Sequence, residues 1–109
     1  MIIMQGDSYP IYMELTQDGA PLTPDMVAEL EVCVGDKLRK LYSSQQVLFD
    51  ESSDRWYIHP TQEETLGLEA NTNYDVIVRI RYKGTIPEEV LGMRLGQITV
   101  RDGTSEAVI

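Results

Sequence analysis

The strongest constraint on the fold is the alternation of side chains along residues 74–82, which read YDVIVRIRY. Every second position is apolar or aromatic, and Asp75, Arg79 and Arg81 lie between them. Successive side chains of a strand point to opposite faces, so such a segment buries one face and exposes the other to water. The pattern therefore predicts a central strand of a sheet.

Two other segments repeat this pattern. Residues 30–34 alternate with Glu29 and Glu31 directed outward, and residues 11–15 alternate with Glu14 and Thr16 outward. Three long half-buried strands indicate an antiparallel sheet. Shorter strands are predicted at residues 38–42, 47–49, 55–59 and 96–101. Turn-forming residues separate these segments at spacings of roughly 8–12 residues, which is typical of a sandwich or barrel.

Two short helical turns interrupt the strands. Residues 61–64 (TQEE) match the capping box, and Gly67 is placed to end that turn. Residues 23–26 (TPDM) offer a hydroxyl cap, Pro24 at the first helical position and an acid in the first turn. We therefore predict an all-β fold, with residues 1–109 forming one antiparallel sandwich of about seven to eight strands and one or two helical turns.

The charge excludes some partners. The chain carries 18 acidic and 9 basic residues, a net charge of −9, and residues 1–36 contain no lysine or arginine and carry −7 of it. Proteins that bind nucleic acid or anionic membranes use clustered basic residues, so we expect neither partner. No secretory signal or apolar span is recognisable, and we expect synthesis in the cytoplasm.

Few residues could carry chemistry. With one cysteine, Cys33, and one histidine, His59, zinc sites built from thiolate and imidazole ligands are not possible, and no nucleophile with its base is apparent. Asp50, Glu51 and Asp54 are a weak candidate for calcium, with a solvated hairpin loop as the alternative. We expect no catalytic residues and no cofactor.

Aromatic residues offer a candidate surface. Trp56 and Ile58 would share one strand face, while Tyr57 and His59 share the other. Because Trp56 is the only tryptophan of the chain, we expect its face to be buried in the core. Tyr12 and Tyr57 are then outward and could contribute to an interaction surface. Gly92 and Gly96 are interpreted as bulge or turn positions entering the last strand.

The order of several motifs resembles a known family. The opening GDSY (residues 6–9), an alternating strand and DGAPL (residues 18–22) are followed by TQEET (residues 61–65), the YD that begins the long strand at Tyr74, and GQITV (residues 96–100). This order is similar to that of the N-terminal domain of phage baseplate upper proteins. The chain departs from the family in a longer loop at residues 83–89. The resemblance implies an immunoglobulin-like sandwich that serves as an attachment or assembly module.

The leading hypothesis is therefore a structural protein of a phage or prophage virion, in its tail or baseplate. It would be no enzyme, would be made in the bacterial cytoplasm, and would dock onto other phage structural proteins. A homo-oligomer is a further possibility, because outward acids of one copy could meet basic residues of another and close a ring. The acids are Glu14, Glu29 and Glu31; the basic residues are Arg79 and Arg81, or Lys37, Arg39 and Lys40. The alternative is that each set is a solvated face.

Two other functions stay open. The exposed aromatics and the acidic loop are compatible with a small carbohydrate-binding sandwich. The charge is compatible with an acidic inhibitor that imitates a phosphate track, although basic residues interrupt the later two thirds of the chain.

Overall fold

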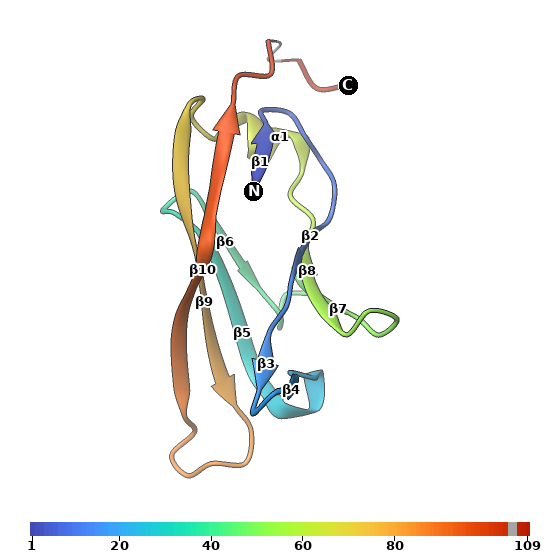
Figure 1. Ribbon diagram of the computed structural model, residues 1–109, viewed down its shortest axis with the longest axis vertical. Helices are drawn as coiled ribbons and strands as arrows, with labels where there is room; N and C mark the ends of the chain where they lie inside the picture. Colours follow the sequence, from blue (N-terminus) through green and yellow to red (C-terminus); the bar gives the residue numbers. More distant parts are fainter. Residues whose placement is uncertain (105–106) are drawn as a thin grey trace.

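The computed structural model describes residues 1–104 and 107–109, and most of its regular structure is β-strand (Figure 1). Five strands form the larger sheet in the order β1-β10-β9-β5-β6, and three form a smaller sheet in the order β2-β8-β7. The larger sheet consists of β1 (Ile2–Met4), β10 (Val90–Arg101), β9 (Thr72–Tyr82), β5 (Val27–Val34) and β6 (Leu38–Leu41). The smaller sheet consists of β2 (Ile11–Met13), β8 (Arg55–Ile58) and β7 (Val47–Asp50), and a two-stranded hairpin joins β3 (Thr16–Gln17) to β4 (Ala20–Pro21).

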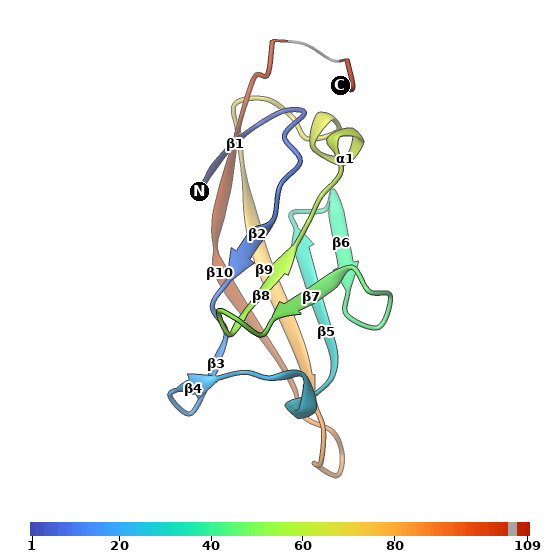
Figure 2. The same ribbon diagram turned by 90° about the vertical axis from the view of Figure 1, so that its right-hand side faces the viewer.

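The predicted all-β, sandwich-like fold is confirmed. Figure 2 shows the smaller sheet in front of the larger one, and the side chains between them form one core. Two details differ from the prediction. The described residues contain more strands than expected, because β1, β3 and β4 were not predicted. The larger sheet is mixed rather than antiparallel, because β1 pairs with β10 in parallel.

The core takes its side chains from both sheets. Trp56 on β8 is fully buried, as predicted, and its indole N–H donates to the Leu22 carbonyl oxygen at 2.8 Å. The rings of Tyr42 and Phe49 pack against it edge-on, with centroids 5.3 and 5.1 Å away. An apolar row on the larger sheet faces this cluster: Leu30, Val32, Val34, Val76, Val78, Ile80, Ile98 and Val100.

The alternation that predicted β9 is confirmed residue by residue. Tyr74, Val76, Val78 and Ile80 are buried, while the positions between them are exposed. β5 also directs Leu30, Val32 and Val34 inward. Since β9 pairs with β10 on one side and β5 on the other, it is the central strand of the larger sheet.

Both predicted helical turns are present. α1 (Gln62–Leu66) has the capping box, in which the Glu64 amide donates to the Thr61 hydroxyl and the Thr61 amide donates to the Glu64 carboxylate. The turn η1 (Pro24–Met26) is a 3-10 helix with proline in its first turn. The predicted hydroxyl cap is wrong there, because Thr23 donates to the Asp25 carboxylate and caps no backbone amide.

β10 is much longer than the predicted strand at residues 96–101. It begins at Val90, so Gly92 lies within a regular ladder, opposite Arg79, and not in a turn. The prediction for Gly96 is confirmed, since the register with β9 shifts between Arg94 and Gly96. The predicted loop at residues 83–89 connects the two strands and forms the lower end of the molecule in Figure 1.

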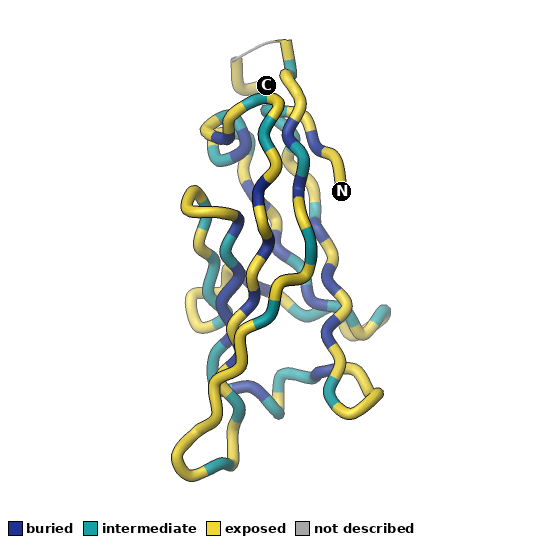
Figure 3. The backbone as a smooth tube through the Cα atoms, turned by 60° about the vertical axis from the view of Figure 1, so that its left-hand side comes forward, coloured by how far each residue is buried: buried dark blue, intermediate teal, exposed yellow. Residues whose placement is uncertain are grey.

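The chain is elongated, with extents of 49 × 26 × 24 Å. Figure 3 shows buried residues concentrated in the middle of the two sheets and exposed residues along the lower β9–β10 hairpin. Within the described residues, none of the helices has the length and apolar character required to cross a membrane.

Candidate interaction surfaces

The outer face of the larger sheet carries an ion cluster centred on Glu31. Its two carboxylate oxygens accept hydrogen bonds from Arg79 Nε at 2.7 Å and Arg39 Nε at 2.6 Å. The ladder brings the three residues together, because Glu31 on β5 lies opposite Arg79 on β9 while its neighbour Cys33 lies opposite Arg39 on β6. The two guanidinium groups leave the Glu31 residue only 6% exposed. The hydrogen bond from Arg79 has the largest effect on the pKa of Glu31, and the bond from Arg39 adds to it. Together they outweigh the opposing effect of burial and lower this pKa to about 2.

This cluster corrects the predicted pairing between copies. Glu31 was predicted to be free for a second copy, but it is nearly buried and is paired within its own chain. Glu29 lies opposite Arg81 in the ladder and accepts hydrogen bonds from the amide and hydroxyl of Ser43. Arg81 also pairs with Glu88, with a separation of 3.5 Å. The basic residues proposed for the second copy are therefore largely engaged inside one chain.

The remaining basic residues of that hypothesis also have partners in the chain. Lys40 donates to Glu64 on α1, and Lys37 lies 4.0 Å from Glu69. Neither Glu14 nor Glu29 has an ion pair among the described residues. Glu29 is half-buried and hydrogen-bonded to Ser43, whereas Glu14 is exposed. Of the three predicted acids, Glu14 is therefore the most accessible to a charge on another molecule.

The aromatic surface is placed as predicted. Tyr12 on β2 lies opposite Tyr57 on β8, with ring centroids 5.3 Å apart, and Tyr12 is 41% exposed. The Arg55 guanidinium stacks on the Tyr12 ring at 4.1 Å from its centroid. The three side chains form a compact outward patch on the smaller sheet.

The acidic loop forms the hairpin between β7 and β8. The Asp50 carboxylate accepts hydrogen bonds from the Ser52 amide and the Ser52 and Ser53 hydroxyls, which lower its pKa. These bonds hold the turn itself. Within the described residues, Asp50, Glu51 and Asp54 are not brought together as a group that could hold a metal ion. The geometry therefore matches the hairpin alternative.

The two other candidates for chemistry lie apart. Cys33 is half-buried on the outer face beside the Glu31 cluster, and burial together with the nearby carboxylate raises the pKa of its thiol. A raised pKa disfavours the thiolate, which is the nucleophilic form. His59 is exposed at the end of β8. The structure does not bring the two residues together at one site.

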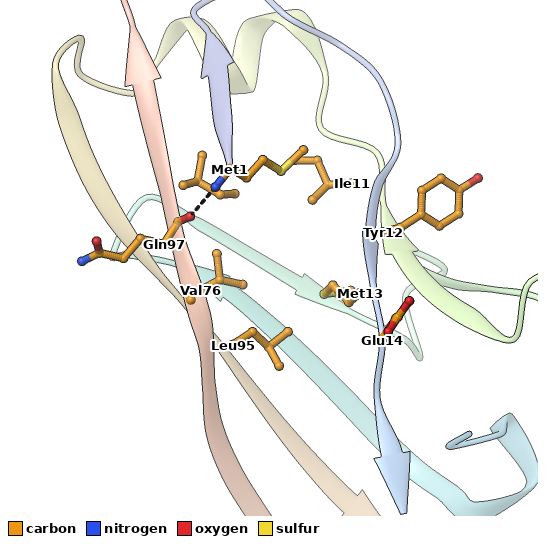
Figure 4. A pocket seen from close by; sticks show the side chains of 10 residues that line it. Met1, Ile11, Tyr12, Met13, Glu14, Val76, Leu95 and Gln97 are labelled. Atoms are coloured by element: carbon orange, nitrogen blue, oxygen red, sulfur yellow. Dashed lines mark hydrogen bonds between the residues drawn. The ribbon is translucent and has the colours of Figure 1, made fainter. Parts of the chain in front are cut away.

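A groove that was not predicted lies between the edges of the two sheets (Figure 4). It has a volume of about 340 Å³ and is bounded by β2 on one side and β10 on the other. Its apolar lining residues are Met1, Ile11, Met13, Val76, Leu95 and Ile98. Of residues 90–95, which were not interpreted as a strand, Leu95 lines the groove.

Other exposed apolar side chains lie on the β9–β10 hairpin, where Val90 borders a separate hollow on the outer face beside Glu29 and Arg81. Val90 and Leu91 are 62% and 49% exposed, and Ile86 in the connecting loop is fully exposed.

Comparisons of the chain with protein-family models, with curated proteins and with solved structures found no match.

Proposed function

We propose that this protein is a structural module of a phage or prophage virion, located in its tail or baseplate, that docks onto other virion proteins. The order of motifs that resembles the N-terminal domain of baseplate upper proteins supports the assignment to a virion. The same resemblance implies an immunoglobulin-like sandwich, and we include this form of the fold in the proposal. The protein acts by binding and carries out no reaction.

One structural observation supports docking above all. The β9–β10 hairpin projects from the sandwich and exposes Ile86, Val90 and Leu91, while β10 continues into an apolar groove. Exposed apolar side chains gathered at one end of a small protein are typical of an interaction site. Most charged side chains of the larger sheet, by contrast, neutralise one another within the chain. The exposed apolar side chains of the hairpin are therefore the surface that would gain most from being covered.

The experiment that tests this proposal locates the protein in particles. Particles of the phage that carries this sequence are purified through a density gradient, and their proteins are identified by mass spectrometry. Immunogold labelling with an antibody to the chain then shows its position by electron microscopy. We expect the chain in particles, with label at the tail end. Its presence in infected cells together with its absence from purified particles would refute the proposal.

The patch of Tyr12, Tyr57 and Arg55 supports a second candidate function, carbohydrate binding. An exposed tyrosine whose ring is held in place by neighbours is a suitable platform for a sugar ring. A glycan array probed with the wild-type protein and with the Tyr12→Ala variant tests this function, each with and without a chelator. Signals that disappear in the variant would support it, and no signal in any arm would remove it.

A further inference from the structure

The first half of β10 is a strand edge without a partner. β10 pairs with β9 along its length, but on its other side β1 covers only residues 99–101. Within the described residues, positions 90–96 carry no second strand. The Tyr82 amide donates to the Glu89 carbonyl oxygen at 2.9 Å, which fixes the alternation of the ladder. By that alternation, Val90, Gly92 and Arg94 direct their backbone N–H and C=O groups toward the open side.

The same edge already binds a strand higher up. The Thr99 amide donates to the Met1 carbonyl oxygen at 2.8 Å, and the Met1 amino group donates to the Gln97 carbonyl oxygen at 3.3 Å. β1 is parallel to β10 at this position. A further strand placed alongside residues 90–96 would therefore continue the line of β1, with the backbone spacing that β1 already demonstrates.

The groove borders this open edge at Leu95 and Gly96, and it would receive the side chains of a strand that passes these two residues. The bulge between Arg94 and Gly96 adds one residue, and Figure 4 shows Leu95 directed into the groove, toward Met13 on β2. Its volume of about 340 Å³ lies at the lower end of the range of about 300–1,000 Å³ that is usual for pockets of organic ligands, and most of its lining residues are apolar. An apolar lining between two strand edges fits the side chains of an extended peptide.

Charge indicates the chemistry of that peptide. Glu14 is the one charged side chain among the residues that line the groove, and it has no ion pair within the described residues. The Met1 amino group also borders the groove, but it donates to the Gln97 carbonyl oxygen and forms no ion pair with Glu14. A second copy of the chain carries the same net charge of −9, and like charges repel. A basic segment of another protein is attracted instead.

We propose that the open side between β2 and β10 binds an extended segment of a partner protein in which apolar and basic residues alternate. The segment pairs as an added strand with residues 90–94 and places apolar side chains in the groove where it passes Leu95 and Gly96, with a lysine or arginine near Glu14. The identity of the partner as a virion protein rests on the proposed function. The peptide chemistry inferred from the groove is independent of that function.

The test uses the whole chain and a displayed library of random short peptides as the probe. Selected peptides are synthesised and titrated by fluorescence anisotropy, and their site is mapped by the amide shifts of the ¹⁵N-labelled protein. We expect enriched peptides to alternate apolar residues with lysine or arginine. We expect the largest shifts at residues 12–14 and 90–97.

Two pairs of variants separate the edge from the groove. Gly92→Pro removes an outward N–H that β9 does not use, and Gly92→Ala retains it with an ordinary 3.5 Å contact to Arg79. Leu95→Asp puts a charge into the groove, and Leu48→Asp changes a leucine of almost equal exposure, 38% against 37%, on β7. Gly92→Pro and Leu95→Asp should each weaken binding by about tenfold or more, and the two controls by less than about twofold.

Glu14→Gln tests the charge separately. The variant should weaken basic peptides and leave neutral ones unchanged. Thermal unfolding confirms that each variant is folded. The inference would be overturned by a lack of enriched peptides, by binding that Gly92→Pro and Leu95→Asp leave intact, or by shifts confined to other faces. A dimer in sedimentation that Gly92→Pro dissociates would also overturn it, because a second copy would then be the occupant. Absence from purified particles would refute the proposed function and leave the peptide results unaffected.

Discussion

Replacing Glu31 with glutamine isolates the charge of the carboxylate that Arg39 and Arg79 share. Glutamine has nearly the same shape, but its amide nitrogen presents a donor to one of two donating guanidinium groups. The Glu31 side chain is only 7% exposed, so water cannot readily replace the lost partner. The variant therefore leaves the backbone of β5 in place and removes the attraction at the centre of the cluster.

The pKa of Glu31 gives the size of the effect. A folded pKa of about 2 against an ordinary value of 4.5 corresponds to at most ~3 kcal/mol of stability at neutral pH. The arginine side chains are 59% and 61% exposed, so water screens both pairs. We therefore expect Glu31→Gln to lower the free energy of unfolding by ~1–2 kcal/mol at pH 7. The contribution is complete above the unfolded pKa and declines as the pH falls toward 2.

Urea denaturation measures this difference without adding salt, which would itself screen the ion pairs. The wild type, Glu31→Gln and the control Glu14→Gln are compared at pH 7 and pH 3. We expect the destabilisation by Glu31→Gln to shrink by roughly half or more at pH 3, and Glu14→Gln to stay within ~0.5 kcal/mol of the wild type at pH 7. Equal destabilisation by Glu31→Gln at both pH values, or none at pH 7, would refute the reasoning.

Three other substitutions test the contacts that hold the fold, the first two by urea denaturation and the third by amide hydrogen exchange. Trp56→Phe removes the buried indole hydrogen bond and leaves a carbonyl unpaired, which should cost ~1–3 kcal/mol; an unchanged stability would contradict that role. Thr65→Val removes a hydroxyl that donates to the Asp7 carbonyl at 2.8 Å, and a similar loss is expected, with faster amide exchange at Gly6. Gly103→Ala would place a Cβ 2.2 Å from the Gln5 carbonyl oxygen; we expect the exchange protection of β1 amides to fall, and unchanged protection would contradict this contact.

The strands that bury one face were predictable from sequence because alternation reports burial directly. β9 and β5 lie between other strands and contact the core, so each second residue must be apolar. The capping box at Thr61 was predictable for a similar reason, since its hydrogen bonds are local. Trp56 was placed in the core by its size and by the alternation of its neighbours.

The strands that were missed lack that signal. The first half of β10 carries Val90 and Leu91 on opposite faces and exposes both, so it shows no alternation in burial. β1 is three residues long and is defined by hydrogen bonds to a strand almost the whole chain away. Such pairing depends on the tertiary fold, and the local sequence does not encode it.

The candidate surfaces were also predictable only where strand alternation determines them. The outward positions of Tyr12, Tyr57 and Glu14 follow from strand alternation and are confirmed. The prediction that Glu31 is free for a second copy was wrong. The alternation of side chains predicts which face of the sheet Glu31 lies on, but not which residues lie next to it on that face. The ladder register that sets Arg79 beside it is a property of the assembled sheet. The groove was missed for the same reason, since it lies between two edges that do not meet in sequence.

The bulge at Leu95 divides β10 into two halves that differ in local stability. Beyond it, Ile98 and Val100 are buried, and exchange of the amides there requires opening of the core. Before it, Val90 and Leu91 bury little surface, so residues 90–94 can open while the rest of the sheet stays folded. A partner strand that paired with this half would suppress its opening without altering the core. In amide hydrogen exchange, the complex with the partner strand would therefore differ from the free protein by slow exchange at residues 90–94 only, at one end of β10.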